Sequence, residues 1–181
     1  MQHHRHTGTK NGLDFLKGRV AEALVETMFR RAGYAVSRSG RETQLHRLYK
    51  TGPDEYLPDF MIRRAVPRPG SDRPLHTLVP IEVKYRYDVS RFLEVEAAGF
   101  FQQAKRWPGL YLVLVTDNPD ADRSCFQVLD DKLDPPRTSD LHMVAALDVY
   151  RSTVLEYDTL GQKLFRLIAE HRLALDTAAN L

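Results

Sequence analysis

The sequence predicts an α/β fold in which a central mixed β-sheet is flanked by helices on both sides. Apolar residues recur at helical spacing from Leu13 until Gly33 ends the pattern. Residues 56–66 and 75–87 have strand character and are separated by a turn-rich stretch, which predicts a hairpin. The continuous apolar run 110–115 is typical of a strand that is buried on both faces.

The other elements follow from the same signals and from breaks at Gly and Pro. In chain order they are a strand at 34–38, a long connection at 39–55 with a turn or partial helix near 45–49, the hairpin connection at 67–74, a helix at 91–107, a polar loop at 117–123 and a short edge strand at 125–129. Residues 141–150 fit either a helix or a strand. Residues 159–175 predict an amphipathic helix near the end of the chain.

The composition predicts one globular domain. The chain has 181 residues, of which 43% are hydrophobic and 28% are charged, as is usual for proteins with a packed core. We expect the domain to span residues 12–181, and the histidine-rich residues 1–11 to be a flexible arm or an added leader. A single cysteine, Cys125, and the lack of an apolar run of bilayer length predict an intracellular, cytoplasmic protein that does not bind a membrane.

Positive charge is concentrated near the N-terminus, although the net charge is only +2. Residues 1–50 hold ten Lys and Arg against four Asp and Glu, residues 51–108 hold nine against eight, and residues 109–181 hold seven against twelve. This gradient fits either a basic surface that binds a polyanion or an ordinary solvated surface.

Two short motifs carry the candidate chemistry: Pro58-Asp59 in the first hairpin strand and Ile81-Glu82-Val83-Lys84 in the second. Side chains alternate along a strand, so Glu82 and Lys84 share one face, and the hairpin brings Asp59 beside Glu82. Two adjacent carboxylates suit Mg²⁺ or Mn²⁺, which accept oxygen ligands and can assist phosphodiester hydrolysis. The structural alternative is a cross-strand ion pair of Asp59 and Lys84, with Glu82 as a rim acid.

These motifs resemble the active-site pattern of the PD-(D/E)xK nuclease superfamily, and residues 12–116 resemble its restriction-endonuclease-like core in the order of their elements. Residues 117–181 lie outside the resemblance and are expected to add a helical C-terminal extension. The chain is most similar to archaeal-type Holliday junction resolvases and small replication and repair nucleases, through Lys17-Gly18, Glu22, Gly33-Tyr34, Ser39-Gly40, Pro58-Asp59 and Ile81-Glu82-Val83-Lys84.

The resemblance implies a Mg²⁺- or Mn²⁺-dependent DNA endonuclease. Asp59, Glu82 and the Val83 carbonyl would bind the metal, and Glu22 on the first helix would complete the site. Glu26, one helical turn later, is the alternative to Glu22. By the same resemblance Lys84 would position the attacking water or stabilise the charge that develops on phosphate. The alternative functions are a restriction-type or mobile-element endonuclease, a non-catalytic nucleic-acid-binding domain of the same fold, and a subunit that depends on a partner for activity.

A weaker resemblance concerns the helix after the lysine. Gln103, with Trp107 one turn beyond it, resembles the glutamine-x-x-x-aromatic element of some branches of the superfamily. Gln102 competes for the glutamine position. Trp107 is expected to be a core aromatic.

The expected partner is duplex or branched DNA, and a homodimer is expected because two cuts need two sites. Phosphate contacts are predicted for the basic residues after the first helix and around the hairpin, which are Arg30, Arg31, Arg38, Arg41, Arg47, Lys50, Arg63, Arg64, Arg68 and Arg73.

Overall fold

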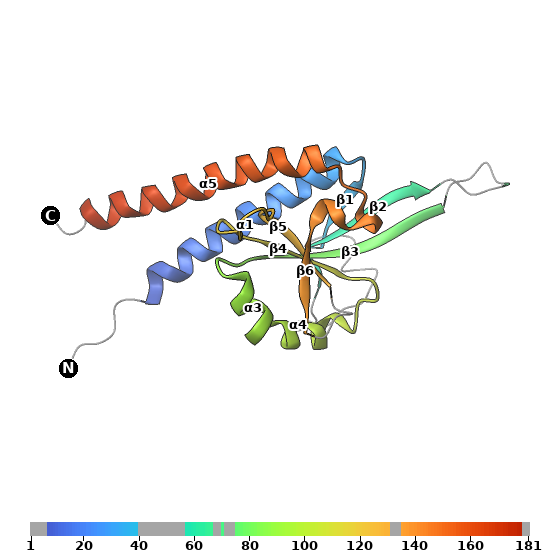
Figure 1. The fold of residues 1–181 in the computed structure, drawn as a ribbon, viewed down its shortest axis with the longest axis horizontal. Helices are drawn as coiled ribbons and strands as arrows, with labels where there is room; N and C mark the ends of the chain where they lie inside the picture. The colour runs from blue at the N-terminus through green and yellow to red at the C-terminus, as the bar shows by residue number, and fades with distance from the viewer. Residues whose placement is uncertain (1–6, 40–56, 67–69, 71–74, 131–134, 179–181) are drawn as a thin grey trace.

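The computed structural model describes residues 7–39, 57–66, 70, 75–130 and 135–178. These residues form a six-stranded sheet flanked by helices (Figure 1). The strands are β1 (Ala35–Arg38), β2 (Phe60–Val66), β3 (Leu75–Tyr85), β4 (Tyr111–Val115), β5 (Phe126–Asp130) and β6 (Arg137–Asp140). The helices are α1 (Thr7–Arg31), α3 (Val89–Val95), α4 (Ala97–Ala104) and α5 (Arg151–Ala178), with short 3₁₀ turns at Leu141–Met143 and Ala145–Leu147.

The sheet is mixed, as the sequence predicts, and its strands lie side by side in chain order. β2 and β3 form the predicted antiparallel hairpin, whereas β3 and β4 are parallel and are connected through α3 and α4. All other neighbouring strands are antiparallel. The parallel pair sets the second half of β3 in the interior of the sheet, between β2 and β4, and α1 packs on one of its faces.

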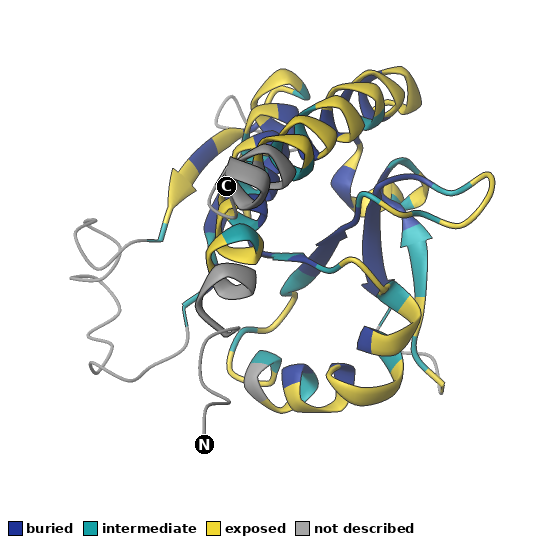
Figure 2. Ribbon diagram, turned by 90° about the vertical axis from the view of Figure 1, so that its left-hand side faces the viewer, coloured by how far each residue is buried: buried dark blue, intermediate teal, exposed yellow. Residues whose placement is uncertain are grey.

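Two layers of helices cover the sheet, α1 and α5 on one face and α3 and α4 on the other (Figure 1). Val83 and Val113 point toward α1 and α5 and belong to the larger core cluster, with Phe165 of α5. Leu112 and Leu114 alternate with these residues and pack under α3 and α4. Buried residues accordingly line the sheet and the inner sides of the helices, while exposed residues lie outside (Figure 2).

Several element boundaries differ from the prediction. α1 begins at Thr7, inside the segment expected as an N-terminal arm, and α5 begins at Arg151. The helix expected at 91–107 is two helices, because a turn at Glu96 interrupts it. Asp88 caps the first helix by accepting a hydrogen bond from the Arg91 backbone N–H at 2.8 Å.

The C-terminal third is part of the same sheet. β5 was expected at an edge but is internal, because β6 pairs along its outer side. Residues 141–150, which fitted a helix or a strand, contain the two 3₁₀ turns. The turn expected near 45–49 lies outside the described residues. No described helix is long and apolar enough to cross a membrane.

A buried polar network fastens α1 to the end of β3. The Lys17 ammonium donates to a carboxylate oxygen of Asp117 at 2.6 Å and to the Tyr85 hydroxyl at 2.9 Å. Tyr85 in turn donates to the other Asp117 oxygen at 2.7 Å. Burial, followed by the hydrogen bond to Asp117, raises the pKa of Tyr85, so its hydroxyl remains a donor. Because Tyr85 follows Lys84, the network ties α1 to the strand position next to the candidate site.

Asp117→Ala should lower the free energy of unfolding by about 3 kcal/mol, because it leaves the Lys17 ammonium buried without its carboxylate. Adding Lys17→Met to this variant should recover part of the loss, since no unpaired charge then remains. Urea denaturation measures both changes. The exposed Asp120→Ala, in the same loop, is the matched control and should change stability by less than about 0.5 kcal/mol. A double variant less stable than Asp117→Ala would contradict this account.

Candidate active site

The hairpin brings the two motif carboxylates together. Phe60 pairs with Ile81, so the same register carried one residue further sets Asp59 opposite Glu82. Alternation then places Asp59, Glu82 and Lys84 on one face of the sheet, the face on which α3 and α4 also lie. Those two helices pack over Leu112 and Leu114 of β4. The polar residues of β3 therefore lie on the same side of the sheet as α4.

Backbone hydrogen bonds hold Asp59 in place. One of its carboxylate oxygens accepts the Val83 N–H at 2.7 Å, across the hairpin. Its backbone carbonyl accepts the Ser39 N–H at 2.9 Å, which ties it to the segment after β1. Asp59 thus stands just before β2 begins, with one carboxylate oxygen fixed toward β3.

Glu82 is the more deeply buried of the two carboxylates, at 6% exposure. One of its oxygens accepts from the Lys84 ammonium at 2.9 Å. The other oxygen, Oε2, is buried and has no hydrogen-bond partner. A buried carboxylate oxygen without a donor costs folding free energy, so the arrangement is retained at the expense of stability. Such an oxygen is a ready ligand for a cation.

Asp59 has a strongly perturbed acidity. Burial, and next the nearby negative charge of Glu82, raise its pKa from 3.8 to about 7, against the lowering effect of the Val83 hydrogen bond. Two carboxylates this close resist being ionised together unless a positive charge joins them. The Lys84 ammonium lowers the Asp59 pKa only as the last of the contributing causes.

The raised pKa predicts a pH dependence of stability in metal-free protein. Between about pH 4 and pH 7 folded Asp59 keeps a proton that the unfolded chain releases, so rising pH favours unfolding across this window. Urea denaturation in EDTA should show wild type losing on the order of 2 kcal/mol more than Asp59→Asn between pH 5 and pH 8. The asparagine variant controls for every other titrating group, and equal losses in the two proteins would contradict a raised pKa.

Glu22 approaches this pair from α1. Its carboxylate accepts from Arg19 at 2.6 Å and is 18% exposed. Burial raises the Glu22 pKa, Arg19 and Arg38 oppose that change, and Glu82 adds to it. The mutual effects among Glu22, Asp59 and Glu82 show that the three carboxylates share one electrostatic environment.

Glu26, the alternative to Glu22, has different neighbours. One of its carboxylate oxygens accepts from Arg30 at 2.8 Å, and the other accepts from both Nε and Nη2 of Arg38. Burial would raise the Glu26 pKa, but the hydrogen bonds from Arg38 and Arg30 outweigh it and lower the pKa. Glu26 therefore fixes two arginines, and Arg38 extends its positive charge toward Glu22 and Asp59.

The donor set around β3 fits a hard divalent cation. Glu82 Oε2 has no hydrogen-bond partner, and Asp59, whose other oxygen accepts the Val83 N–H, stands opposite Glu82 across the hairpin. Mg²⁺ is commonly held by one or two carboxylates while water and substrate oxygens fill its other positions. In the described part of the chain, no group of three or more His, Cys, Asp and Glu side chains is placed to hold a metal ion.

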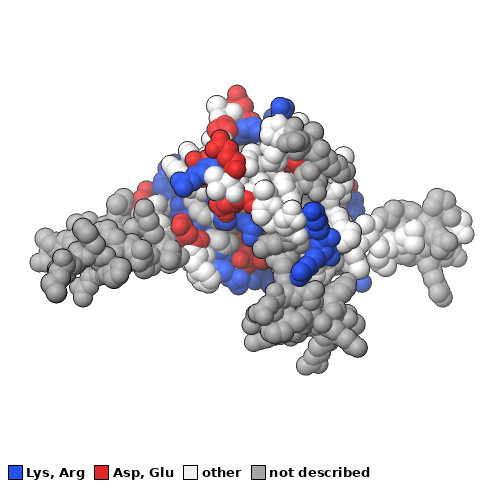
Figure 3. Space-filling view, turned by 90° about the horizontal axis from the view of Figure 1, so that it is seen from below, with Lys and Arg blue, Asp and Glu red and all other residues white. Residues whose placement is uncertain are grey.

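The basic residues named from the sequence have several different positions. Arg30 and Arg38 bind Glu26, Arg31 forms an ion pair with Glu156 of α5 at 2.6 Å, and Arg64 pairs with Asp148. Arg63 is exposed on the sheet face of Asp59. Arg41, Arg47, Lys50, Arg68 and Arg73 lie outside the described residues. Figure 3 shows acidic and basic side chains beside one another, so the visible described surface is not uniformly basic.

The weaker helix element is described only in part. Gln103 belongs to α4, but its side chain lies outside what the structure describes. Gln102 is exposed and accepts from Lys105 at 3.0 Å. Trp107, expected in the core, is only half-buried and belongs to neither core cluster.

Two features were not found by sequence reasoning. The contact of Glu26 with Arg38 depends on the approach of β1 to α1, for which the sequence shows no pattern. Lys17 was part of the family resemblance but had no assigned partner, since Asp117 is 100 residues away along the chain.

Comparisons with protein-family models, with curated proteins and with solved structures gave no match to this chain.

Proposed function

We propose that this chain is a divalent-metal-dependent phosphodiesterase. The observation that carries the proposal is the pairing of two largely buried carboxylates, Asp59 and Glu82, with an unpartnered oxygen on Glu82 and an ammonium group, Lys84, beside them. The arrangement destabilises the fold and suits a cation that bridges the protein to a phosphate.

Within that class we propose a DNA endonuclease of the PD-(D/E)xK type, with a restriction-endonuclease-like core. The support is the motif order, the antiparallel hairpin that carries Asp59 and Glu82, and the parallel β3–β4 pair reached through helices. Glu22 on α1 supplies a third carboxylate near the pair. Arg38, which Glu26 holds, agrees with the basic charge of the N-terminal region. Cleavage of duplex or branched DNA, and a homodimeric state, remain predictions.

Each residue has a distinct part in the proposed hydrolysis. When bound, the divalent ion polarises water and the scissile phosphate. Asp59 and Glu82 would hold that ion, helped by the Val83 carbonyl, and Glu22 would orient water around it. The Lys84 ammonium would leave Glu82 as the ion binds and donate hydrogen bonds to the attacking water or to a phosphate oxygen. Arg38, held by Glu26, would bind a neighbouring phosphate.

A cleavage assay tests the proposal. The purified chain is incubated with end-labelled single-stranded, duplex and four-way-branched DNA in Mg²⁺, Mn²⁺ or EDTA. We expect cut products with at least one substrate in metal and none in EDTA. No cleavage of any substrate in either metal, or equal cleavage in EDTA, would contradict the proposed function.

A further inference from the structure

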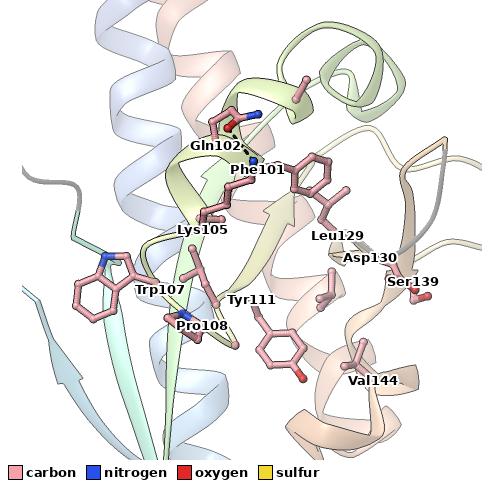
Figure 4. Close-up of a pocket in the computed structure, with 15 residues that line it drawn as sticks. Phe101, Gln102, Lys105, Trp107, Pro108, Tyr111, Leu129, Asp130, Ser139 and Val144 are labelled. Atoms are coloured by element: carbon pink, nitrogen blue, oxygen red, sulfur yellow. Dashed lines mark hydrogen bonds between the residues drawn. The ribbon is translucent and has the colours of Figure 1, made fainter.

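A cavity of about 980 Å³ lies at the end of α4 and is lined by none of the residues used by the proposed hydrolysis. Its walls come from α4, the loop that follows it, the start of β4 and the ends of β5 and β6 (Figure 4). The side chains that matter to its chemistry are Phe101, Gln102, Lys105, Trp107, Tyr111 and Ser139. Its volume is within the range of sites that bind small organic groups.

Aromatic rings and a few polar groups make up these walls. Phe101, Trp107 and Tyr111 are all only partly buried, and Figure 4 shows Trp107 and Tyr111 on either side of Pro108. Lys105 donates to the Gln102 amide oxygen at 3.0 Å, so an ammonium group stands at the rim of the cavity. Flat apolar surfaces beside a cation match the two halves of a nucleotide, its base and its phosphate.

The cavity adjoins the strand that carries the candidate site. Tyr111 is the β4 partner of Ile81, and Leu112 is the partner of Glu82. With strands about 4.8 Å apart and residues rising about 3.3 Å, the Cα atoms of Tyr111 and Glu82 are on the order of 6 Å apart, although the Tyr111 side chain packs against the larger core cluster on the opposite face of the sheet. α4, which forms one wall, covers the sheet face toward which Glu82 points. A strand held at Glu82 can therefore pass close to the cavity.

We propose that this cavity binds an unstacked nucleobase of a single-stranded segment of the nucleic acid. An aromatic platform binds any base through its π-face, and the rim ammonium holds the adjoining phosphate. The Gln102 amide and the Ser139 hydroxyl line the cavity and can form hydrogen bonds with polar groups on the base edge. The ligand class rests on the proposed function, and binding in the cavity would direct the enzyme to DNA with an unpaired stretch near the cut.

Trp107 provides a direct readout, because it is the single tryptophan of the chain. Its fluorescence is measured in EDTA, where no cleavage is required, during titration with a short oligothymidylate. An abasic oligonucleotide of equal length controls for binding through phosphates alone, thymidine monophosphate tests for a free nucleotide, and a blunt duplex tests for paired DNA. We expect saturable quenching by oligothymidylate and little by the other three.

A second arm uses substitution. Tyr111→Leu removes one platform and should weaken oligothymidylate binding on the order of tenfold, as the loss of one stacked base does. Tyr150→Leu removes an exposed tyrosine that does not line the cavity and should leave binding unchanged. A circular dichroism melt of both variants shows whether either has lost its fold, and the wild-type comparison with the abasic oligonucleotide does not depend on any variant.

The outcomes separate this inference from the proposed function. Quenching by oligothymidylate in a protein that cuts nothing would support base binding in the cavity and count against the proposed nuclease activity. Cleavage without any change in Trp107 fluorescence would overturn the cavity alone. Equal quenching by the abasic oligonucleotide, by the monophosphate or by blunt duplex would also overturn it, because each shows that an unstacked base in a strand is not what the cavity recognises.

Discussion

Replacing Asp59 with Asn is expected to abolish metal-dependent cleavage, with a loss of at least about 100-fold in the rate of the chemical step. The amide keeps an oxygen that can accept the Val83 N–H, so the local backbone is retained. It cannot carry the negative charge that would hold a divalent ion beside Glu82. The same change relieves repulsion between two buried carboxylates, so the metal-free variant should be at least as stable as wild type at pH 8.

Single-turnover cleavage and urea denaturation of the same preparations measure the two effects together. Asp120→Asn, an exposed aspartate far along the chain, is the matched control and should cut as wild type does. If the variant loses activity while its stability is unchanged or higher, Asp59 is a functional residue. Replacing an acid of a structural ion pair would lower both the activity and the stability. If Asp59→Asn cuts at the wild-type rate, the metal site is wrong.

Replacing Lys84 with Ala is expected to lower the rate of the chemical step at least about 100-fold and to leave metal affinity intact. The ammonium lies beside Glu82 and would donate hydrogen bonds to the attacking water or to a phosphate oxygen, most strongly as negative charge develops in the transition state. Lys84→Arg should not restore activity, since the planar guanidinium presents its donors differently from a compact ammonium.

Single-turnover kinetics at several DNA concentrations test this expectation, with Lys163→Ala on α5 as a control for the loss of one positive charge. A fall in the maximal rate at unchanged half-saturation indicates a role in the chemical step. A change only in the DNA concentration that gives half the maximal rate would instead indicate that Lys84 is one of several phosphate contacts.

The sequence was sufficient to predict the hairpin, the buried strand β4 and the carboxylate pair, because these depend on short-range alternation. Glu82 and Lys84 had to share a face, and β4 had to be buried on both faces, whatever the remainder of the chain did. The hairpin then required only that residues 56–66 and 75–87 pair, and Asp59 met β3 as predicted.

What could not be predicted depends on contacts between distant segments. β6 follows Pro135-Pro136, which indicated only a break, and becomes a strand by pairing with β5. α1 starts in polar residues that have no apolar periodicity. Glu26 and Glu22 are equivalent in a helical pattern, and only the approach of Arg38 from β1 distinguishes them.

The central claim is that Asp59 and Glu82 together hold a divalent ion. Electron paramagnetic resonance measures Mn²⁺ binding directly, because the signal of free Mn²⁺ falls as the protein is added at pH 8. His3, His4 and His6 are replaced by alanine in every protein used, so that only the candidate site is counted. The account predicts one saturable Mn²⁺ site, weakened at least about tenfold by Asp59→Asn or Glu82→Gln and not weakened by Lys84→Ala. Absence of bound Mn²⁺, or equal affinity in wild type and Asp59→Asn, would contradict it.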